Sequence, residues 1–117
     1  MLIQLNTDNH IDGRDPVLRQ VATDLEQSLT RFAAEITRVE VHFQDANAHK
    51  AGDSDKRCLL EARLRGHDPL AVSHSAATLT VAYQGARDKL VKLLARHDEK
   101  HRAEGRRVAA DSGELLR

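Results

Sequence analysis

The sequence predicts an α+β domain with the element order β-α-β-β-β-α. Three segments alternate apolar and polar residues with the period of two that is typical of half-buried strands, and two longer segments repeat apolar residues at helical spacing. Alternation in the strands implies a sheet with one buried face. Because each helix has one apolar stripe to cover, we expect a four-stranded sheet with both helices packed on that face.

The first third of the chain supplies one strand and one helix. Residues 2–7 alternate between apolar and polar side chains and form the first predicted strand. A turn-rich stretch follows, and Asp15 then precedes Pro16, which suits a helix start because the first turn does not need the missing N–H of proline. Apolar residues recur at intervals of three and four after this start, so we predict a helix over residues 16–34.

Three further strands and a second helix are predicted in the rest of the chain. Alternation predicts strands over residues 37–45 and 56–66, and a shorter strand is predicted over residues 70–73. We expect the first strand-helix-strand unit to be a right-handed parallel crossover and the later strands to pair antiparallel. Ser75 can cap the second helix, whose apolar stripe continues to about Arg102.

Two glycines in the C-terminal half have different expected roles. Gly85 lies inside the second helix, where glycine costs about 1 kcal/mol relative to alanine, and its small size can allow close contact between helix and sheet. Gly105 is expected to end the ordered part of the chain. We therefore predict a single domain over residues 1–102 and a short disordered tail over residues 103–117.

The composition argues against several classes of protein. No apolar run approaches the roughly 20 residues of a membrane helix, and the N-terminus does not resemble a signal peptide, so we expect a cytoplasmic protein without a membrane partner. The single cysteine, Cys58, excludes an internal disulfide and a cysteine-only zinc site. Its place on the inward side of a strand predicts a buried structural thiol.

The charges are unevenly distributed, although the net charge is +0. Residues 1–52 carry five Lys or Arg and eight Asp or Glu, whereas residues 53–117 carry 13 and 10. In the second helix, four cations follow one another at intervals of three, four and four residues and therefore share one face of the helix. These residues, which we call the basic ridge, are Lys89, Lys92, Arg96 and Lys100.

The basic ridge predicts binding to a polyanion. Four cations in a row can neutralise successive phosphates of a nucleic acid, in a manner that depends strongly on salt. The ridge holds no aromatic residue, so recognition of the backbone and shape of folded RNA suits it better than stacking on bases. The alternative interpretation is a solvated charged face, because Asp88, Asp98 and Glu99 interrupt the cations.

No motif of the sequence supports an enzyme. His97 and His101 are four residues apart and could face one metal ion, but Asp98 stands where zincins carry glutamate, and Lys100 lies between the two rings. We therefore expect a packed His97, an exposed His101 and no metal. The sequence shows no glycine-rich phosphate loop, serine elbow or paired carboxylates, so we also expect no cofactor and no small-molecule substrate.

One segment of the second helix, residues 88–100, begins Asp-Lys-Leu and continues with a basic residue, a leucine and further basic residues. Shorter segments at residues 3–11, 29–32 and 36–41 support it by their order and spacing. Over residues 1–102 the chain thereby resembles the family of ribosome hibernation promoting factors and ribosome-associated inhibitors, also known as sigma-factor modulation proteins.

The resemblance implies a fold similar to double-stranded-RNA-binding domains. It also implies binding to ribosomal RNA of the small subunit, in the channel used by mRNA and tRNA, which silences idle ribosomes. Carried over residue by residue, the RNA contacts fall on Lys89, Lys92, Arg96 and Lys100. We add Arg63 and Arg65 on the third strand as candidates from geometry alone. Without the C-terminal domain of long members, the chain is expected to act as short members do.

A second hypothesis stays open at this point. The net charge of zero is unlike that of strongly basic RNA binders. The predicted open face of the sheet mixes Arg38 and Arg63 with Glu40 and Glu61, as a protein-binding surface would. The chain could therefore be an interaction module of the same fold that has lost ribosome binding, with a weak homodimer through the open sheet.

Overall fold

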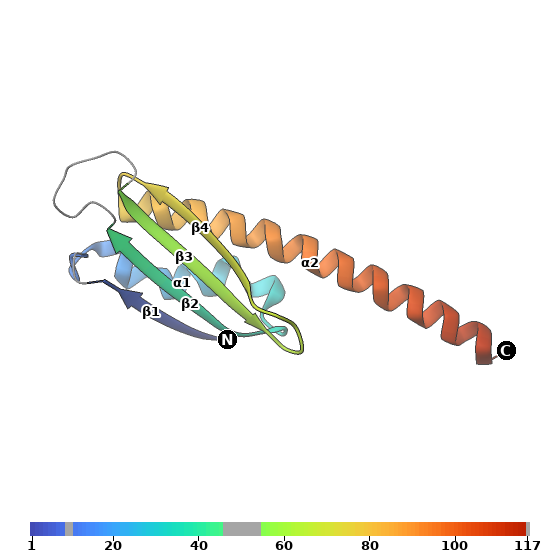
Figure 1. Cartoon of the computed structure of the whole chain (residues 1–117). Coiled ribbons are helices and arrows are strands. Elements are labelled where there is room, and N and C mark those ends of the chain that lie inside the picture. The colour runs from blue at the N-terminus through green and yellow to red at the C-terminus, as the bar shows by residue number, and fades with distance from the viewer. Residues whose placement is uncertain (9–10, 46–54, 117) are drawn as a thin grey trace.

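Four strands form one mixed sheet in the computed structural model, which describes residues 1–8, 11–45 and 55–116, with side chains as far as residue 103. The strands lie in chain order across the sheet (Figure 1): β1 (Leu2–Thr7), β2 (Ile36–Asp45), β3 (Lys56–Leu64) and β4 (Leu70–Ala76). β1 pairs with β2 in parallel, and the two remaining pairs are antiparallel. This topology confirms the predicted parallel crossover followed by antiparallel strands.

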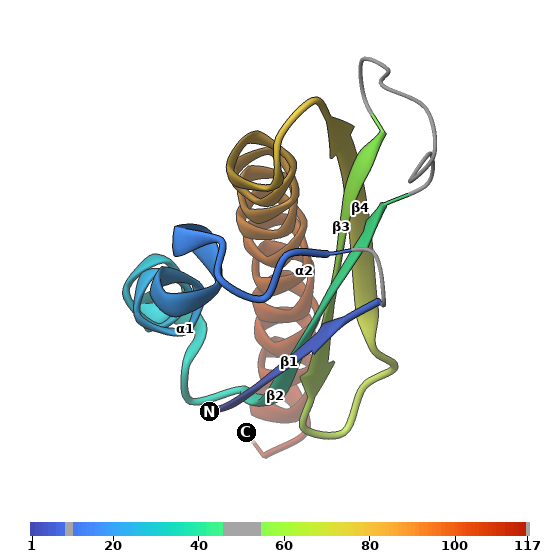
Figure 2. The ribbon, with the colours of Figure 1, turned by 90° about the vertical axis from the view of Figure 1, so that its left-hand side faces the viewer.

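Both helices lie on the same side of the sheet, as predicted. Figure 2 shows α1 (Pro16–Ser28) and α2 (Leu79–Leu116) side by side over one face, while the other face stays open. The core between them is mostly aliphatic. Its largest fully buried side chains come from α1 and the segment after it, β2, β3 and α2: Val21, Leu25, Leu29, Ile36, Val39, Val41, Phe43, Cys58, Leu60 and Leu90.

The first helix begins where the sequence predicts and ends earlier. Asp15 Oδ1 accepts a hydrogen bond from the backbone N–H of Val17 at 3.1 Å, and Pro16 occupies the first turn. The chain then tightens into a short 3-10 turn, η1 (Thr30–Phe32). The hydroxyl of Thr30 donates to carbonyl groups of the last helical turn, at 2.7 and 3.0 Å, and so competes with continuation of the α-helix.

The predicted cap of the second helix was wrong. Ser75 belongs to β4, where it pairs with Arg57 of β3, because strand pairing extends to Ala76. The cap is instead Thr78, whose Oγ1 accepts a hydrogen bond from the N–H of Val81 at 3.2 Å. The backbone pairing of β4 with β3 keeps the chain extended as far as Ala76, so the helix can begin only after that residue.

The second helix is longer than predicted. Its backbone continues through Gly105 to Leu116, so Gly105 does not end the helix. The cost of one helical glycine, about 1 kcal/mol, is opposed by the good helix formers around it, among them Ala103, Ala109 and Ala110. Figure 1 shows the C-terminal part of α2 projecting past the sheet, and the longest dimension of the molecule is 68 Å. The division into a domain over 1–102 and a tail stays a prediction.

The second helix packs closely on β4 at Gly85. A Cβ atom built on Gly85 would lie 2.1 Å from Cδ2 of His74 on β4, which is far inside van der Waals contact. This confirms that a residue without a side chain is needed for the helix to approach the sheet here.

None of the helices in the described ranges has the length and apolar character to cross a bilayer.

Candidate nucleic-acid interface

The basic ridge runs along the flank of α2 that lies beside β4. Lys89 reaches the sheet edge, where its Nζ donates a hydrogen bond to the backbone oxygen of Ser73 at 2.9 Å. At 3.6 residues per turn, the other three cations of the ridge follow Lys89 along the same flank. Lys92, Arg96 and Lys100 are all exposed.

The charges of the basic ridge are not compensated by carboxylates. Among the side chains that the structure describes, none of the four ridge cations forms an ion pair. The partner of Lys89 is a neutral carbonyl group, so its positive charge also remains available. The structure therefore places four uncompensated cations on one exposed flank, which favours an anion-binding surface over a face of internal salt bridges.

Arg87, on the opposite flank of α2, is fully engaged and does not belong to this surface. Its guanidinium contacts Asp24 of α1 and Asp88, each at 3.1 Å. Burial lowers the pKa of Arg87, but hydrogen bonds with the two carboxylates outweigh it, and the net shift is upward. Tyr83 donates a hydrogen bond to the same Asp24, so these groups join α1 to α2.

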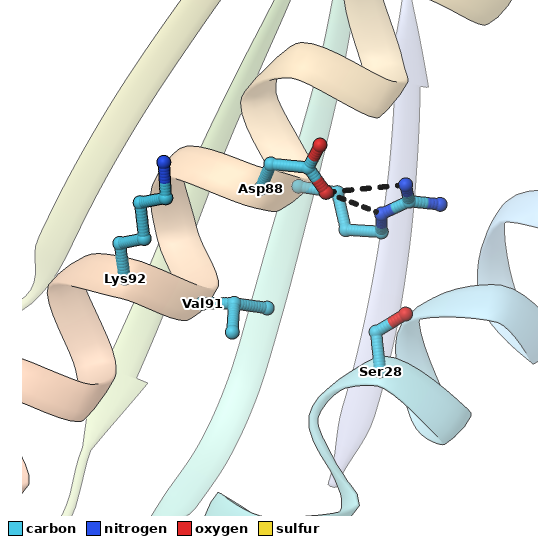
Figure 3. A pocket seen from close by; sticks show the side chains of 5 residues that line it. Ser28, Asp88, Val91 and Lys92 are labelled. Carbon is cyan, nitrogen blue, oxygen red and sulfur yellow. Dashed lines mark hydrogen bonds and ion pairs between the residues drawn. The ribbon is translucent and has the colours of Figure 1, made fainter.

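Arg87 and its neighbours also line an open pocket of about 480 Å³ between the end of α1 and α2. Figure 3 shows Asp88 in contact with the guanidinium, with Ser28 on the facing helix and Lys92 extending from the outer side of α2. The pocket is shallow, and its one carboxylate is already paired with Arg87. It offers no nucleophile or base in a defined geometry, so we assign it no chemistry.

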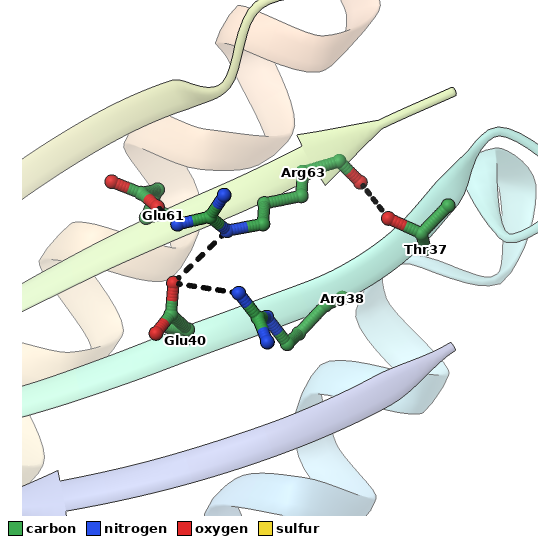
Figure 4. A network of polar contacts seen from close by, with 5 residues as sticks. All are labelled: Thr37, Arg38, Glu40, Glu61 and Arg63. Carbon is green, nitrogen blue, oxygen red and sulfur yellow. Dashed lines mark hydrogen bonds and ion pairs between the residues drawn. The ribbon is translucent and has the colours of Figure 1, made fainter. Parts of the chain in front are cut away.

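The open face of the sheet carries a network of alternating charges (Figure 4). Glu40 lies between two arginines, with its Oε2 3.2 Å from Nε of Arg63 and 3.7 Å from Nη2 of Arg38. Arg63 also contacts Oε1 of Glu61 at 3.1 Å. The hydrogen bond from Arg63 is the main reason that the pKa of Glu40 is lowered, with a further contribution from Arg38.

The two candidate arginines of the third strand therefore differ. Arg63 is held by two carboxylates, on the face of the sheet opposite to α2, so the structure does not bring it together with the basic ridge. Arg65 lies just beyond the end of β3 and is exposed, and its guanidinium forms no ion pair in the described part of the chain. Its backbone N–H is fixed by a hydrogen bond to the carbonyl of Glu35 at 2.9 Å.

His97 and His101 are joined by a third histidine that sequence analysis missed. The ring of His67, in the turn between β3 and β4, contacts both other rings, with 4.9 Å between the ring centroids in each pair. His97 is half-buried and His101 is exposed, as expected. Over the described ranges, no three His, Cys, Asp or Glu side chains are arranged to hold a metal ion. No local pattern in the sequence indicates this contact of His67 with the helix.

The single cysteine is buried, as predicted. Cys58 points into the core from β3 with no exposed surface. Burial raises the pKa of its thiol to about 12, so the thiolate, which is the reactive form, is scarce at neutral pH. The position supports a packing role.

Residues 5–102 include most of the sheet, all of α1 and the whole basic ridge, and they match the family model described as Sigma 54 modulation protein / S30EA ribosomal protein. The chain belongs to this family. The match confirms the family that the sequence motifs indicated, and it leaves residues 103–117 unmatched. No curated protein matches the sequence.

The S30EA fold is also found in solved structures. The N-terminal domain of Protein Y from Thermus thermophilus is similar with a TM-score of 0.64 at 21% identity, over 83% of this chain and 99% of that one. A ribosomal subunit interface protein from Coxiella burnetii is similar with a TM-score of 0.63 at 19% identity, over 85% and 99% of the two chains. At these identities, the likeness establishes the shared fold.

Proposed function

We propose that this S30EA family member binds ribosomal RNA of the small ribosomal subunit and holds idle ribosomes in an inactive state. The observation that carries the proposal is the basic ridge, whose four cations share one flank of α2 and have no carboxylate partner among the described side chains. The family description and the name of the similar Coxiella burnetii protein both point to the ribosome as the partner.

The dimensions of the basic ridge suit an RNA backbone. A rise of 1.5 Å per residue places Lys89 and Lys100 about 16 Å apart along the helix axis, which is enough to meet several successive phosphates. The zero net charge does not oppose this binding, because the excess of acidic residues lies in residues 1–52. The approach of RNA to α2 depends on the local electrostatic field of the basic ridge. With no aromatic residue on the ridge, the contacts would be to the backbone and shape of folded RNA.

The arginines at β3 contribute unequally to this proposal. Arg65 is exposed and without an ion pair in the described part of the chain, so it can contact a phosphate as it stands. Arg63 would first have to leave Glu40 and Glu61, which offsets part of any gain from a new contact. We propose Arg65 as an auxiliary contact and expect a smaller effect from Arg63.

Co-sedimentation with purified small subunits tests the proposal. A variant that neutralises the ridge, K89Q/K92Q/R96Q, should bind at least about tenfold more weakly. With fewer cations on the ridge, binding neutralises fewer phosphates and releases fewer counterions from the RNA. The matched control is R14Q/R19Q/R31Q, which removes three exposed cations outside α2. The proposal requires the control to pellet with the subunits like the unaltered chain. Equal binding of the ridge variant, with its fold verified by circular dichroism, would refute it.

The open sheet supports a second candidate function, self-association. Its alternating Arg and Glu side chains form a nearly neutral surface that a second copy could match by opposite charges. Sedimentation equilibrium of the full chain at up to about 0.1 mM tests this candidate, because a weak homodimer would be populated there. A dimer that E61K dissociates supports it, and a monomer at all concentrations rejects it.

A further inference from the structure

Three histidine rings meet at the end of the basic ridge. His67 comes from the turn between β3 and β4, whereas His97 and His101 stand on successive turns of α2. The His67 ring meets each of the others edge to face, and the rings of His97 and His101 are nearly parallel, with 6.4 Å between their centroids. The three rings and Lys100 line a pocket of about 190 Å³.

Lys100 lines this histidine pocket with its permanently charged side chain, and it belongs to both the pocket and the basic ridge. The charged residues next to the three histidines along the chain are Arg65 and Asp68 around the turn, and Arg96, Asp98, Glu99 and Arg102 on α2. The buried carboxylate of Asp98 is bound to Arg102 at 3.3 Å. The side chains of Asp68 and Glu99 are exposed and do not line the pocket.

Protonation of the three imidazoles changes the pocket from weakly to strongly cationic. Histidine is the side chain that gains its charge between about pH 8 and pH 5. Protonated rings whose centroids are 4.9 Å apart repel one another and Lys100. An anion bound between them offsets this repulsion by its attraction to all of the cations. Proton uptake and anion binding are therefore linked, and each must favour the other.

We propose that His67, His97, His101 and Lys100 form a phosphate-binding site whose affinity for a phosphate group rises as the pH falls. The N–H groups of protonated imidazoles and the ammonium group are donors that suit phosphate oxygens. Because Lys100 joins the pocket to the basic ridge, the phosphate is that of the RNA backbone, and this part of the inference rests on the proposed function. RNA binding then strengthens when the medium is acidified.

The first test uses inorganic phosphate and the full chain, without ribosomes. Histidine ring resonances are followed by NMR during a phosphate titration at about pH 6 and about pH 7.5. We expect saturable shifts of His67, His97 and His101 that need less phosphate at the lower pH. His42, on the open face of the sheet, is the internal control and should not move. The absence of saturable shifts, or equal shifts of His42, overturns the site.

The second test measures binding of the full chain to purified small subunits at the same two pH values and constant ionic strength. The unaltered chain and H42Q should bind about tenfold more tightly at the lower pH, whereas H67Q/H97Q/H101Q should change by less than about twofold. The single variant H67Q, in an exposed turn, gives a second readout should the triple variant unfold. Equal affinity of the unaltered chain at both pH values overturns the pH-dependent site and leaves the proposed function standing. No binding at either pH refutes the proposed function, and the phosphate titration still decides the site.

Discussion

Lys89 Nζ donates a hydrogen bond to the backbone carbonyl oxygen of Ser73, 2.9 Å away, and this contact joins the basic ridge to the edge of the sheet. β4 is the last strand of the sheet, and Lys89 covers one of the polar backbone groups along its edge. An RNA backbone that follows the ridge would thus run parallel to α2 and beside β4. The long side chain of Lys89 can swing outward to a phosphate, since the bond to Ser73 is exposed.

The close approach of α2 to β4 one turn earlier makes Gly85 sensitive to substitution. Gly85→Ala gains about 1 kcal/mol of helix propensity but forces its new Cβ against the His74 ring, at a cost of about 1–3 kcal/mol. We expect the free energy of unfolding, measured with urea, to fall by up to about 2 kcal/mol, which is the steric cost less the gain in propensity. In a His74→Ala background the same substitution should be neutral or stabilising. A stabilising effect of Gly85→Ala alone would show that the contact is not restrictive.

The contact between Tyr83 and Asp24 predicts a stability that declines in alkali. Burial, followed by the hydrogen bond to Asp24, raises the pKa of this tyrosine above its usual 10.0. A group with a raised folded-state pKa contributes stability that is fully present below the unfolded-state pKa and is lost as the pH rises through the folded-state value. Because Tyr83 is the single tyrosine, phenolate absorbance reports it alone. We expect ionisation only well above pH 10, or together with unfolding; titration near pH 10 in the folded protein would disprove the contact.

Removal of the tyrosine hydroxyl tests the same contact at neutral pH. Tyr83→Phe should lower the free energy of unfolding by about 1–2 kcal/mol, because a hydrogen bond to a carboxylate is lost. The loss is no larger because Asp24 is partly exposed, so that water can replace the tyrosine hydroxyl. Arg87 keeps its ion pair with Asp24 in this variant, so the helix pair should stay folded. Thermal unfolding followed by circular dichroism measures the change. No change in unfolding temperature would mean that the bond contributes nothing.

The charge network of the open sheet predicts a loss of stability in acid. Arg63 lowers the pKa of Glu40 below its usual 4.5. A carboxylate with a depressed folded-state pKa contributes stability that is present above the unfolded-state pKa and is lost as the pH falls through the folded-state value. The Glu40→Gln variant should therefore unfold with less dependence on pH below about 4.5 than the unaltered chain. Parallel pH profiles of the two proteins would contradict the network.

Most of the fold could be predicted from sequence because its signals are local. The period of two marked the strands, the helical period marked α1 and α2, and Asp15 with Pro16 marked a helix start. The error in the cap of α2 arose because a long-range contact decides where that helix begins. Pairing of β4 with β3 moved the helix cap from Ser75 to Thr78, and the sequence around Ser75 holds no sign of that pairing.

The candidate site was predictable only in part. The spacing of the basic ridge showed that its cations share one flank of α2, since helix geometry fixes that relation. The pairing of Arg63 could not be foreseen, because it depends on the register that sets Glu40 opposite Glu61 across β2 and β3. The contact of His67 with His97 depends on the turn after β3 reaching the middle of α2, which no local pattern encodes.

The salt dependence of binding tests the central claim most directly, because it counts phosphate contacts. The affinity of the full chain for purified small subunits is measured across a series of salt concentrations, for the unaltered chain and for K92Q/R96Q. If the basic ridge meets the RNA backbone, the slope of log affinity against log salt should become shallower by about two, near one per lost cation. An unchanged slope, with both proteins bound to the subunit, would contradict the assignment of the ridge to RNA phosphates.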